Sequence, residues 1–256
     1  VGTPLKDWDI NIYRGVLTGY NEAFIISTEK RNEILANCQT EDERTRTAEL
    51  IRPILRGRDI KRYGYNWANL WLINTHNGIR GKLERVHIED YPAIKAHLDQ
   101  YWDRISKRAD KGDTPYNLRN CAYLEDFSKP KILWKRVGSI LRFCYNDNEA
   151  LGLDSTCFAL GNNIEFVCCV LNTPMGHYLL KDAPKTGTGD LLISVQAVEP
   201  IKLPSVTYEI NIEFKRLLEM MIANCSDDIE NEISQKIFNL YGLSHEEQKY
   251  IEENFT

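Results

Sequence analysis

The sequence lacks any apolar run long enough to cross a membrane. A transmembrane helix needs about 18 or more consecutive apolar residues, and charged residues interrupt every apolar stretch here before that length. The first 20 residues mix Lys6, Asp7, Asp9 and Arg14 with apolar positions, which argues against a signal peptide. We therefore expect a cytoplasmic protein without a membrane partner.

The sequence also lacks a Cys-x-x-Cys pair, and its seven cysteines are an odd number. Several lie inside apolar runs, as in FVCCVL at Phe166–Leu171. These positions favour buried free thiols in a reducing compartment over a disulfide framework or a zinc site.

Motifs of common catalytic sites are absent or weak. The five histidines show no paired metal-ligand spacing, and no Gly-x-Ser-x-Gly elbow occurs. Two Glu-x-Lys triplets, Glu213–Lys215 and Glu247–Lys249, match the spelling of a metal-dependent nuclease site. Both lie in segments predicted to be helical, and no Pro-Asp partner precedes either, so we interpret them as chance matches. The sequence predicts no catalytic residue and no metal ligand.

The negative charge is confined to one end of the chain. Residues 208–256 hold eleven acidic and four basic side chains, a net of −7 within the total of −5, which leaves residues 1–207 at +2. Basic patches that contact a polyanion therefore remain possible upstream of residue 208.

The densest basic cluster is Leu50–Trp67, LIRPILRGRDIKRYGYNW. Pro53 predicts the end of a short helix over Arg46–Arg52, and Gly57 and Gly64 allow tight turns in the loop that follows. The cations of this loop are Arg56, Arg58, Lys61 and Arg62, and aromatic rings stand among them at Tyr63, Tyr65 and Trp67. Such a loop suits a phosphate backbone. A solvated loop whose arginines pair with local acids is an equal alternative.

A second basic group lies on two predicted strands, Lys131–Val137 and Leu141–Tyr145. Its cations are Lys129, Lys131, Lys135, Arg136 and Arg142, with no acid between them. A strand pair presents alternate side chains outward, so these residues are candidate readers of bases in a groove. The loop Ala183–Asp190 adds Lys185 and Thr186. We predict a tight turn there rather than a cofactor loop, because a strand rather than a helix follows its glycines.

Local patterns predict the remaining elements. Strands are expected at Asp9–Val16, Ala23–Ser27, Leu70–Ile73 and Ser155–Leu160, and the first two are expected to form a hairpin with Arg14 beside its turn. Helices are expected over Glu29–Ala36 and Pro92–Arg108, Ile164–Leu171 is expected to be a short apolar helix or strand, and Gln39–Thr45 is expected to be loop.

The end of the chain is predicted to be helical from Tyr208. Gly242 ends the second helix, and Ser244 with Glu247 forms a capping box for the last one. We divide the chain into a recognition domain at 1–207 and a helical appendage at 208–256. The acidic helices are expected either to contact other domains or to complete the core.

Several motifs together resemble a known family. Gly15–Ile26 (GVLTGYNEAFII), followed by LIRPILRGRDIKRY, closely resembles the TaqI-like C-terminal specificity domain of type II and type IIG restriction–modification enzymes. Weaker matches follow in the expected order at Lys129–Val137, Phe166–Leu180, Thr186–Pro204 and Asn239–Glu253. The resemblance covers most of the chain.

The resemblance implies an α+β fold with a twisted, partly barrel-like mixed sheet and flanking helices, and it favours a helix over a strand at Ile164–Leu171. It implies a module that recognises double-stranded DNA for a neighbouring adenine methyltransferase domain. S-adenosylmethionine, and Mg where the parent also cleaves, would belong to that parent protein, because this chain has no Asn-Pro-Pro-Tyr/Phe loop. Since the chain begins at Val1, we expect the methyltransferase and endonuclease domains of the parent chain as partners.

Within this hypothesis the two basic groups divide the work. Phosphate contacts are assigned to Arg56, Arg58, Lys61 and Arg62, and base or groove contacts to Arg14, Lys135, Arg136, Arg142, Lys185 and Thr186. The alternatives are a fragment with nuclease activity of its own, or a phage-defence interaction module without sequence preference. Cleavage of plasmid DNA with magnesium would separate the first alternative from recognition.

Overall fold

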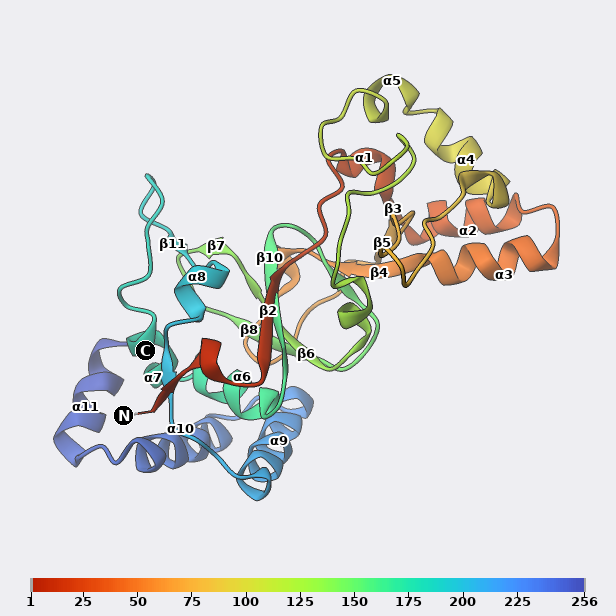
Figure 1. Ribbon diagram of the computed structural model, residues 1–256. Helices are drawn as coiled ribbons and strands as arrows, with labels where there is room; N and C mark the ends of the chain where they lie inside the picture. The colour runs from red at the N-terminus through yellow and green to blue at the C-terminus, as the bar shows by residue number, and fades with distance from the viewer. Residues whose placement is uncertain (1, 256) are drawn as a thin grey trace.

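A four-stranded antiparallel sheet lies in the middle of the computed structural model, which describes residues 2–255. Its strands, in order across the sheet, are β2 (Ile10–Arg14), β10 (Thr156–Gly161), β6 (Lys131–Lys135) and β8 (Phe143–Asn146). Neighbouring residues of a strand point to opposite faces. Trp134 therefore enters one hydrophobic cluster and Leu133 the other. Both faces of this sheet are buried, and each belongs to a different lobe of the molecule (Figure 1).

Helices cover the first face of the central sheet and form one lobe (Figure 1). The buried helix α6 (Ile164–Asn172) packs against this sheet, and α7 (Pro174–Leu179) and α9 (Tyr208–Ala223) pack against α6. Outside them lie α10 (Asp227–Tyr241) and α11 (His245–Asn254). The last three helices share one hydrophobic cluster with the sheet, through Phe214, Phe238 and Ile251. The division at residue 208 into two domains stays a prediction.

A second four-stranded sheet organises the other lobe. Its order is β3 (Ile25–Ser27), β5 (Leu70–Ile73), β4 (Ile51–Leu55) and β9 (Leu151–Gly152). The helices α1 (Asn21–Phe24), α2 (Thr28–Ala36), α3 (Glu41–Leu50), α4 (Pro92–Asp99) and α5 (Trp102–Ile105) belong to this lobe (Figure 1). β9 pairs with β4 and leads directly into β10, so this short segment joins the two sheets.

Short elements complete the chain. β1 (Thr3–Pro4) pairs with β12 (Lys202–Leu203), and β7 (Val137–Gly138) pairs with β11 (Leu191–Leu192), which precedes α8 (Val195–Val198). Single 3₁₀ turns are η1 (Leu5–Asp7), η2 (Gly57–Asp59), η3 (Ile88–Asp90) and η4 (Leu124–Ser128). The predicted α+β class is confirmed, with open sheets and no closed barrel among residues 2–255.

The cysteines behave as their positions predicted. None of the seven forms a disulfide, and five are buried. Burial raises the pKa of Cys157 to about 11 and that of Cys144 to about 12, so both thiols stay protonated at neutral pH. In the described part of the chain, no helix has both the length and the apolar character that a membrane crossing requires.

The predicted hairpin between residues 9–16 and 23–27 is wrong. β2 pairs with β10, whereas β3 pairs with β5 in the other sheet. The short helix α1 separates the two strands, and each finds its partner far along the chain. Tertiary pairing therefore overrides the local turn signal at Thr18–Asn21.

Two further local predictions around α3 are wrong. Gln39–Thr45 is not loop, because Thr40 caps α3: its hydroxyl accepts from Glu43 N at 3.1 Å, and the Glu43 carboxylate accepts from Gln39 N at 2.8 Å. The expected helix over Arg46–Arg52 is the end of α3, and Pro53 lies within β4. β9 pairs with β4 only from Ile54 onward, so one side of Pro53 faces no strand and the proline is tolerated.

The helix predicted over Pro92–Arg108 is shorter than expected. It breaks between α4 and α5 at Gln100 and Tyr101. The predicted helix at Ile164–Leu171 is confirmed as α6, and so are the capping box of Ser244 and Glu247 and the left-handed Gly242 (φ 67°) that ends α10.

The side-chain amine of Lys131 is fully buried, and its titration predicts that the free energy of unfolding rises at alkaline pH. Its Nζ donates to Asn146 Oδ1 and to Asn148 O, both at 2.8 Å, and burial lowers its pKa from 10.5 to about 8. Between these two values the unfolded chain binds more protons than the folded one, so this residue's contribution to stability rises with pH. We expect the unfolding free energy of the native protein, minus that of Lys131→Met, to increase across this window and to stay level below it.

Urea denaturation at a series of pH values measures this difference. The matched control is Lys135→Met on the same strand, because Lys135 is exposed. Its difference from the native protein should not change with pH in the same way. A level difference for Lys131→Met would contradict the prediction.

Candidate nucleic-acid interface

The register of the central sheet gathers predicted site residues at one of its ends. Arg14 of β2 is opposite Cys157 of β10, and Lys135 of β6 is opposite Thr156. β6 and β8 pair through Trp134 and Phe143, so the next position along places Arg142 beside Lys135. Arg14, which is distant in sequence, thus shares one end of the sheet with Lys135, Arg136 and Arg142.

The turn between β9 and β10 holds this end together. Ser155 O accepts from Arg136 N at 3.0 Å, and Ser155 Oγ accepts from Gly57 N at 3.0 Å. A Cβ atom at Gly57 would lie 2.8 Å from Lys135 Cγ, so η2 approaches this far only because residue 57 is glycine. The contact places η2, which carries the exposed Arg58, next to Lys135 at the end of β6. Arg14 reaches the same turn through an ion pair with Asp154 at 3.5 Å.

A finger of residues 184–192 extends from the same end. β11 pairs with β7, and Ile193 N donates to Arg136 O at 2.8 Å, so the base of the finger adjoins Arg136. Thr186 N donates to Asp190 O at 2.8 Å, which closes the tight turn that the sequence predicted. A strand follows this turn, so it has no helix N-terminus that would bind a cofactor phosphate. Lys185 and Thr186 are thereby carried to the cationic end of the sheet.

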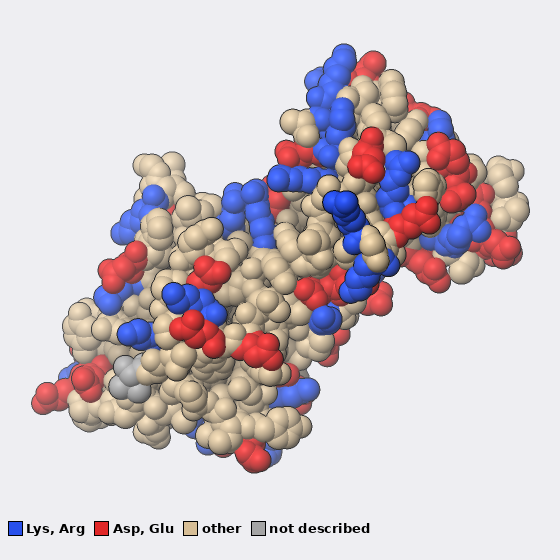
Figure 2. All heavy atoms as spheres, in the orientation of Figure 1, with Lys and Arg blue, Asp and Glu red and all other residues tan. Residues whose placement is uncertain are grey.

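We call this set the basic end; it comprises Arg14, Arg58, Lys135, Arg136, Arg142, Lys185 and Thr186. Figure 2 shows a notch between the finger and the lobe of α4 and α5, and Lys and Arg side chains line its floor and its far wall. The concave outline and the positive charge agree with a surface for a polyanion.

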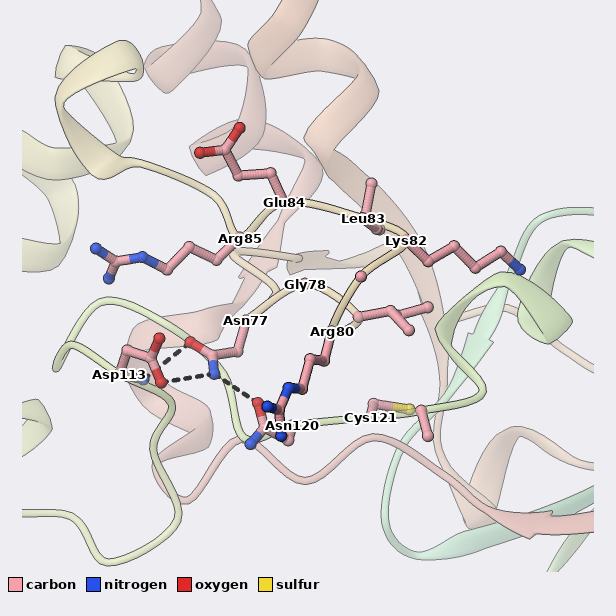
Figure 3. A pocket seen from close by; sticks show the side chains of 13 residues that line it. Asn77, Gly78, Arg80, Lys82, Leu83, Glu84, Arg85, Asp113, Asn120 and Cys121 are labelled. Atoms are coloured by element: carbon pink, nitrogen blue, oxygen red, sulfur yellow. Dashed lines mark hydrogen bonds between the residues drawn. The ribbon is translucent and has the colours of Figure 1, made fainter.

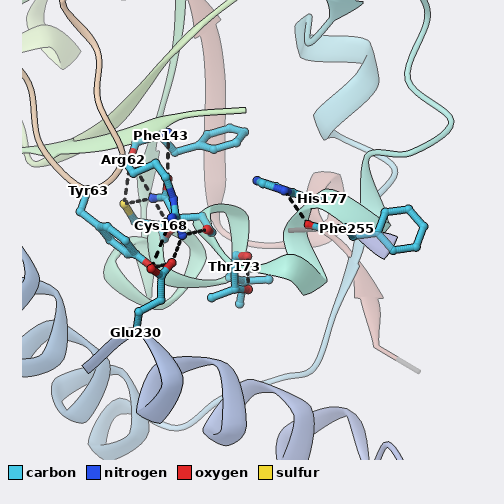
Figure 4. Close-up of polar contacts among 10 residues, drawn as sticks. Arg62, Tyr63, Phe143, Cys168, Thr173, His177, Glu230 and Phe255 are labelled. Carbon is cyan, nitrogen blue, oxygen red and sulfur yellow. Dashed lines mark hydrogen bonds and ion pairs between the residues drawn. The ribbon is translucent and has the colours of Figure 1, made fainter. Parts of the chain in front are cut away.

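Two cations of the Leu50–Trp67 cluster are paired with carboxylates of the protein. Arg56 donates to the buried Asp59 through Nε at 3.1 Å and Nη2 at 2.8 Å, and these hydrogen bonds raise its pKa. Arg62 forms an ion pair with Glu230 of α10 and donates to Asn172 O at 2.6 Å (Figure 4). The acidic C-terminal helices thus bind one of the predicted phosphate contacts. Neither assignment to DNA is tested, and both stay predictions.

Tyr63 was expected as an exposed aromatic face and is 1% exposed. Its backbone N donates to Phe143 O and its carbonyl accepts from Tyr145 N, both at 2.9 Å, so it extends the edge of β8. Its hydroxyl points to Glu230 beside Arg62 (Figure 4). The neighbouring Arg62 is held against Glu230 of α10. No local pattern predicts the contact of Tyr63 with β8, because the partner strand lies 80 residues away along the chain.

A basic loop in the second lobe was missed in the sequence. Residues 78–85 form a turn held by Ile79 N and Leu83 O at 2.8 Å. This loop borders an open groove of about 820 Å³ together with Asn77, Asp113 and Asn120 (Figure 3). Asn77 Nδ2 donates to Asp113 Oδ1 at 3.0 Å and to Asn120 Oδ1 at 2.5 Å. These two hydrogen bonds hold the three side chains in place on the floor of the groove. The loop contributes three cations, Arg80, Lys82 and Arg85. Its sequence, GIRGKLER, is the pattern from which a third basic cluster could have been predicted.

The Glu-x-Lys triplets hold helices together. Glu213 pairs with Lys236 at 2.6 Å, and Lys215 lies 3.8 Å from Glu165. Glu247 completes the capping box of α11. Among residues 2–255, no three His, Cys, Asp or Glu side chains converge so that they could hold a metal ion.

Comparison with known proteins identifies the fold but no sequence family. No family model matches the sequence, and no curated protein does. Matching solved structures include the type IIL restriction–modification enzyme MmeI in complex with DNA, at 10% identity and a TM-score of 0.65 over 97% of this chain. The type IIG restriction endonuclease BpuSI matches at 12% identity and a TM-score of 0.56 over 98% of this chain.

These matches cover 36% of the MmeI chain and 30% of the BpuSI chain. The chain thus has the fold of a segment of these restriction–modification enzymes and spans about a third of their length. The predicted relation to such enzymes is supported at the level of the fold. Its assignment to the TaqI-like specificity domain remains a proposal.

Proposed function

We propose that this chain is the target-recognition module of a type II or IIG restriction–modification enzyme. It would bind double-stranded DNA at the basic end and hold a specific site for a methyltransferase domain. The observation that carries the proposal is the convergence of Arg14, Arg58, Lys135 and Arg136 around the turn at Ser155. The shared fold with an enzyme solved in complex with DNA supports it.

Roles follow from how each side chain is held. Arg58 is exposed and sits on a 3₁₀ turn, which suits a phosphate contact. Arg136 is half-buried with its backbone fixed on both sides, and its buried Nε has no acceptor in the described structure. A guanidinium positioned in this way suits a directed bond to a guanine edge. Lys185 and Thr186, on the finger, would contact the same groove or its backbone.

The reaction itself would belong to neighbouring domains. Other domains of the parent protein would bind S-adenosylmethionine for adenine methylation, and Mg if the parent also cleaves DNA. The outer face of α9 exposes Tyr208, Ile212, Met220 and Ile222, from 40% to 72%. Exposed apolar residues in such a group mark a contact surface, which supports docking of the parent domains on this helix.

Selection from a random duplex library with the purified chain tests the function. We expect an enriched sequence that binds at least about 1,000-fold more tightly than random duplex. Arg136→Ala should cost roughly 10- to 100-fold for the enriched site only, and Arg58→Ala should weaken all duplexes and lower the salt slope by about 1. The control is Lys249→Ala, an exposed residue of α11.

Failure to enrich any sequence would reject sequence-specific recognition in favour of an interaction module. Equal losses on enriched and random duplex for Arg136→Ala and Arg58→Ala would reject the division of roles. Cleavage of plasmid by the chain with magnesium would instead support the nuclease alternative.

A further inference from the structure

A second cavity lies beside β4, and aromatic rings and two arginines line it. It has a volume of about 450 Å³, in the range of small-molecule sites. Its floor is β4 with the end of α3, and its walls are Tyr65, Trp67 and Trp71. The basic segment that follows β4 in sequence thus supplies aromatic side chains to this cavity. We call it the aromatic pocket.

The rings of the aromatic pocket are fixed before any ligand arrives. Trp67 Nε1 donates to Leu70 O at 3.0 Å, and Trp71 Nε1 donates to Thr28 Oγ1 at 2.9 Å. The Tyr65 hydroxyl accepts from Asn148 Nδ2 at 2.8 Å. Trp67 and Trp71 meet edge to face, with their centroids 5.0 Å apart. Their polar atoms are satisfied inside the protein, so a ligand would meet ring faces held in position.

Two guanidinium groups border the same cavity with unused hydrogen-bond donors. Arg31 lies over Trp71, with Cζ 4.2 Å from the ring centroid, and Arg52 is held by Glu149 O at 2.9 Å. Arg31 Nε and Arg52 Nε are both buried, and neither has an acceptor within the described residues. Both atoms are closed to solvent, so a ligand in the cavity would approach these guanidinium groups through their outer nitrogens. Burial also lowers the pKa of Arg31.

The charges decide which flat ligand fits. An aromatic cage alone would suit an organic cation, but two guanidinium groups at its border disfavour one. Glu149 is paired with Arg52 at 3.4 Å, which leaves Glu49 as the remaining carboxylate on the rim. Two guanidinium groups against one remaining carboxylate favour a ligand with a planar ring that carries hydrogen-bond acceptors and an adjacent anionic group.

We propose that the aromatic pocket binds an unstacked nucleobase with its phosphate. The base would stack on Trp67 or Tyr65, and its acceptors or phosphate would contact the outer guanidinium nitrogens of Arg31 and Arg52. The source is either a free mononucleotide or an unpaired base of a nucleic acid. The site is separate from the basic end and does not depend on recognition of paired DNA there.

Calorimetric titration with dAMP and with 2′-deoxyribose 5-phosphate tests the pocket directly. We expect dAMP to bind at least about tenfold more tightly, because only it carries a base that can stack. Trp67→Leu and Arg31→Leu should each weaken dAMP binding by about tenfold or more. Trp67→Phe, which keeps a ring face, should retain most of the affinity, and Trp102→Leu, at an exposed ring outside the pocket, should leave it unchanged.

Fluorescence anisotropy with two duplexes then separates the sources. One duplex is fully paired, and the other carries a single extra adenine. A preference of about tenfold for the extra adenine, lost in Trp67→Leu, supports an unpaired base in DNA as the source. Binding of dAMP without this preference supports a free nucleotide.

The proposal is overturned if dAMP binds no better than the sugar phosphate, or if folded Trp67→Leu and Arg31→Leu variants bind it like the native chain. Loss of paired-duplex binding in variants of Lys135 and Arg136 reports only on the basic end. The dAMP titration therefore reads the pocket even if the proposed DNA recognition fails.

Discussion

Replacing Lys135 and Arg136 together by glutamate is expected to reduce duplex affinity by roughly 100- to 1,000-fold at moderate salt. Each cation lost removes a phosphate or base contact, and each new carboxylate repels the backbone. Both residues lie at the end of β6, beside the turn at Ser155, and neither side chain belongs to the hydrophobic clusters of the core. Binding curves at several salt concentrations, with thermal melting to confirm folding, give the measurement.

Arg62→Ala is the informative comparison for this experiment. Arg62 belongs to the densest basic cluster, yet its guanidinium is bound by Glu230 and Asn172 O. We expect it to lower duplex affinity by less than about threefold, since most of its charge is already compensated. If Arg62→Ala lowered duplex affinity as much as the double variant does, the DNA interface would lie on the Arg62 side of the molecule. The assignment of that interface to the basic end would then be refuted.

Arg108→Met is expected to destabilise the second lobe by about 3–4 kcal/mol. Arg108 is 7% exposed, and its guanidinium donates to the carbonyls of Thr18, Asp110, Pro115 and Asn117. It also stacks on Phe24, with Cζ 4.5 Å from the ring centroid. Burial lowers its pKa to about 10, which still leaves it charged at neutral pH. Methionine fills similar space but leaves these carbonyls without donors.

Chemical denaturation with tryptophan fluorescence measures the loss, and Lys107→Met is the control. Lys107 is the preceding residue and is exposed, so the same replacement there should change stability by less than about 0.5 kcal/mol. Equal stabilities of the two variants would show that the loops around Arg108 do not depend on its hydrogen bonds.

The sequence by itself determined the elements whose signals are local. Gly242 ends α10 because it adopts a positive φ without a steric cost, and Ser244 with Glu247 caps α11 through its own backbone. The strand pair β6–β8 was visible because its partners lie close in sequence. The apolar run at residues 164–171 allowed either a helix or a strand, and only the family resemblance favoured the helix that became α6. The Thr40–Glu43 capping pattern was also readable, although it was assigned to a loop.

Only the tertiary structure decided which cations can act together. Arg14 and Lys135 lie at the same end of the sheet because both of their strands pair with β10, which is more than 140 residues beyond Arg14. Tyr63 is buried because it docks on β8, and that contact turns Arg62 toward Glu230 of α10. Charge along a sequence shows how many cations are present, but ion pairs with distant carboxylates decide which remain free. Those pairings depend on sheet register and helix packing, and no local pattern records either.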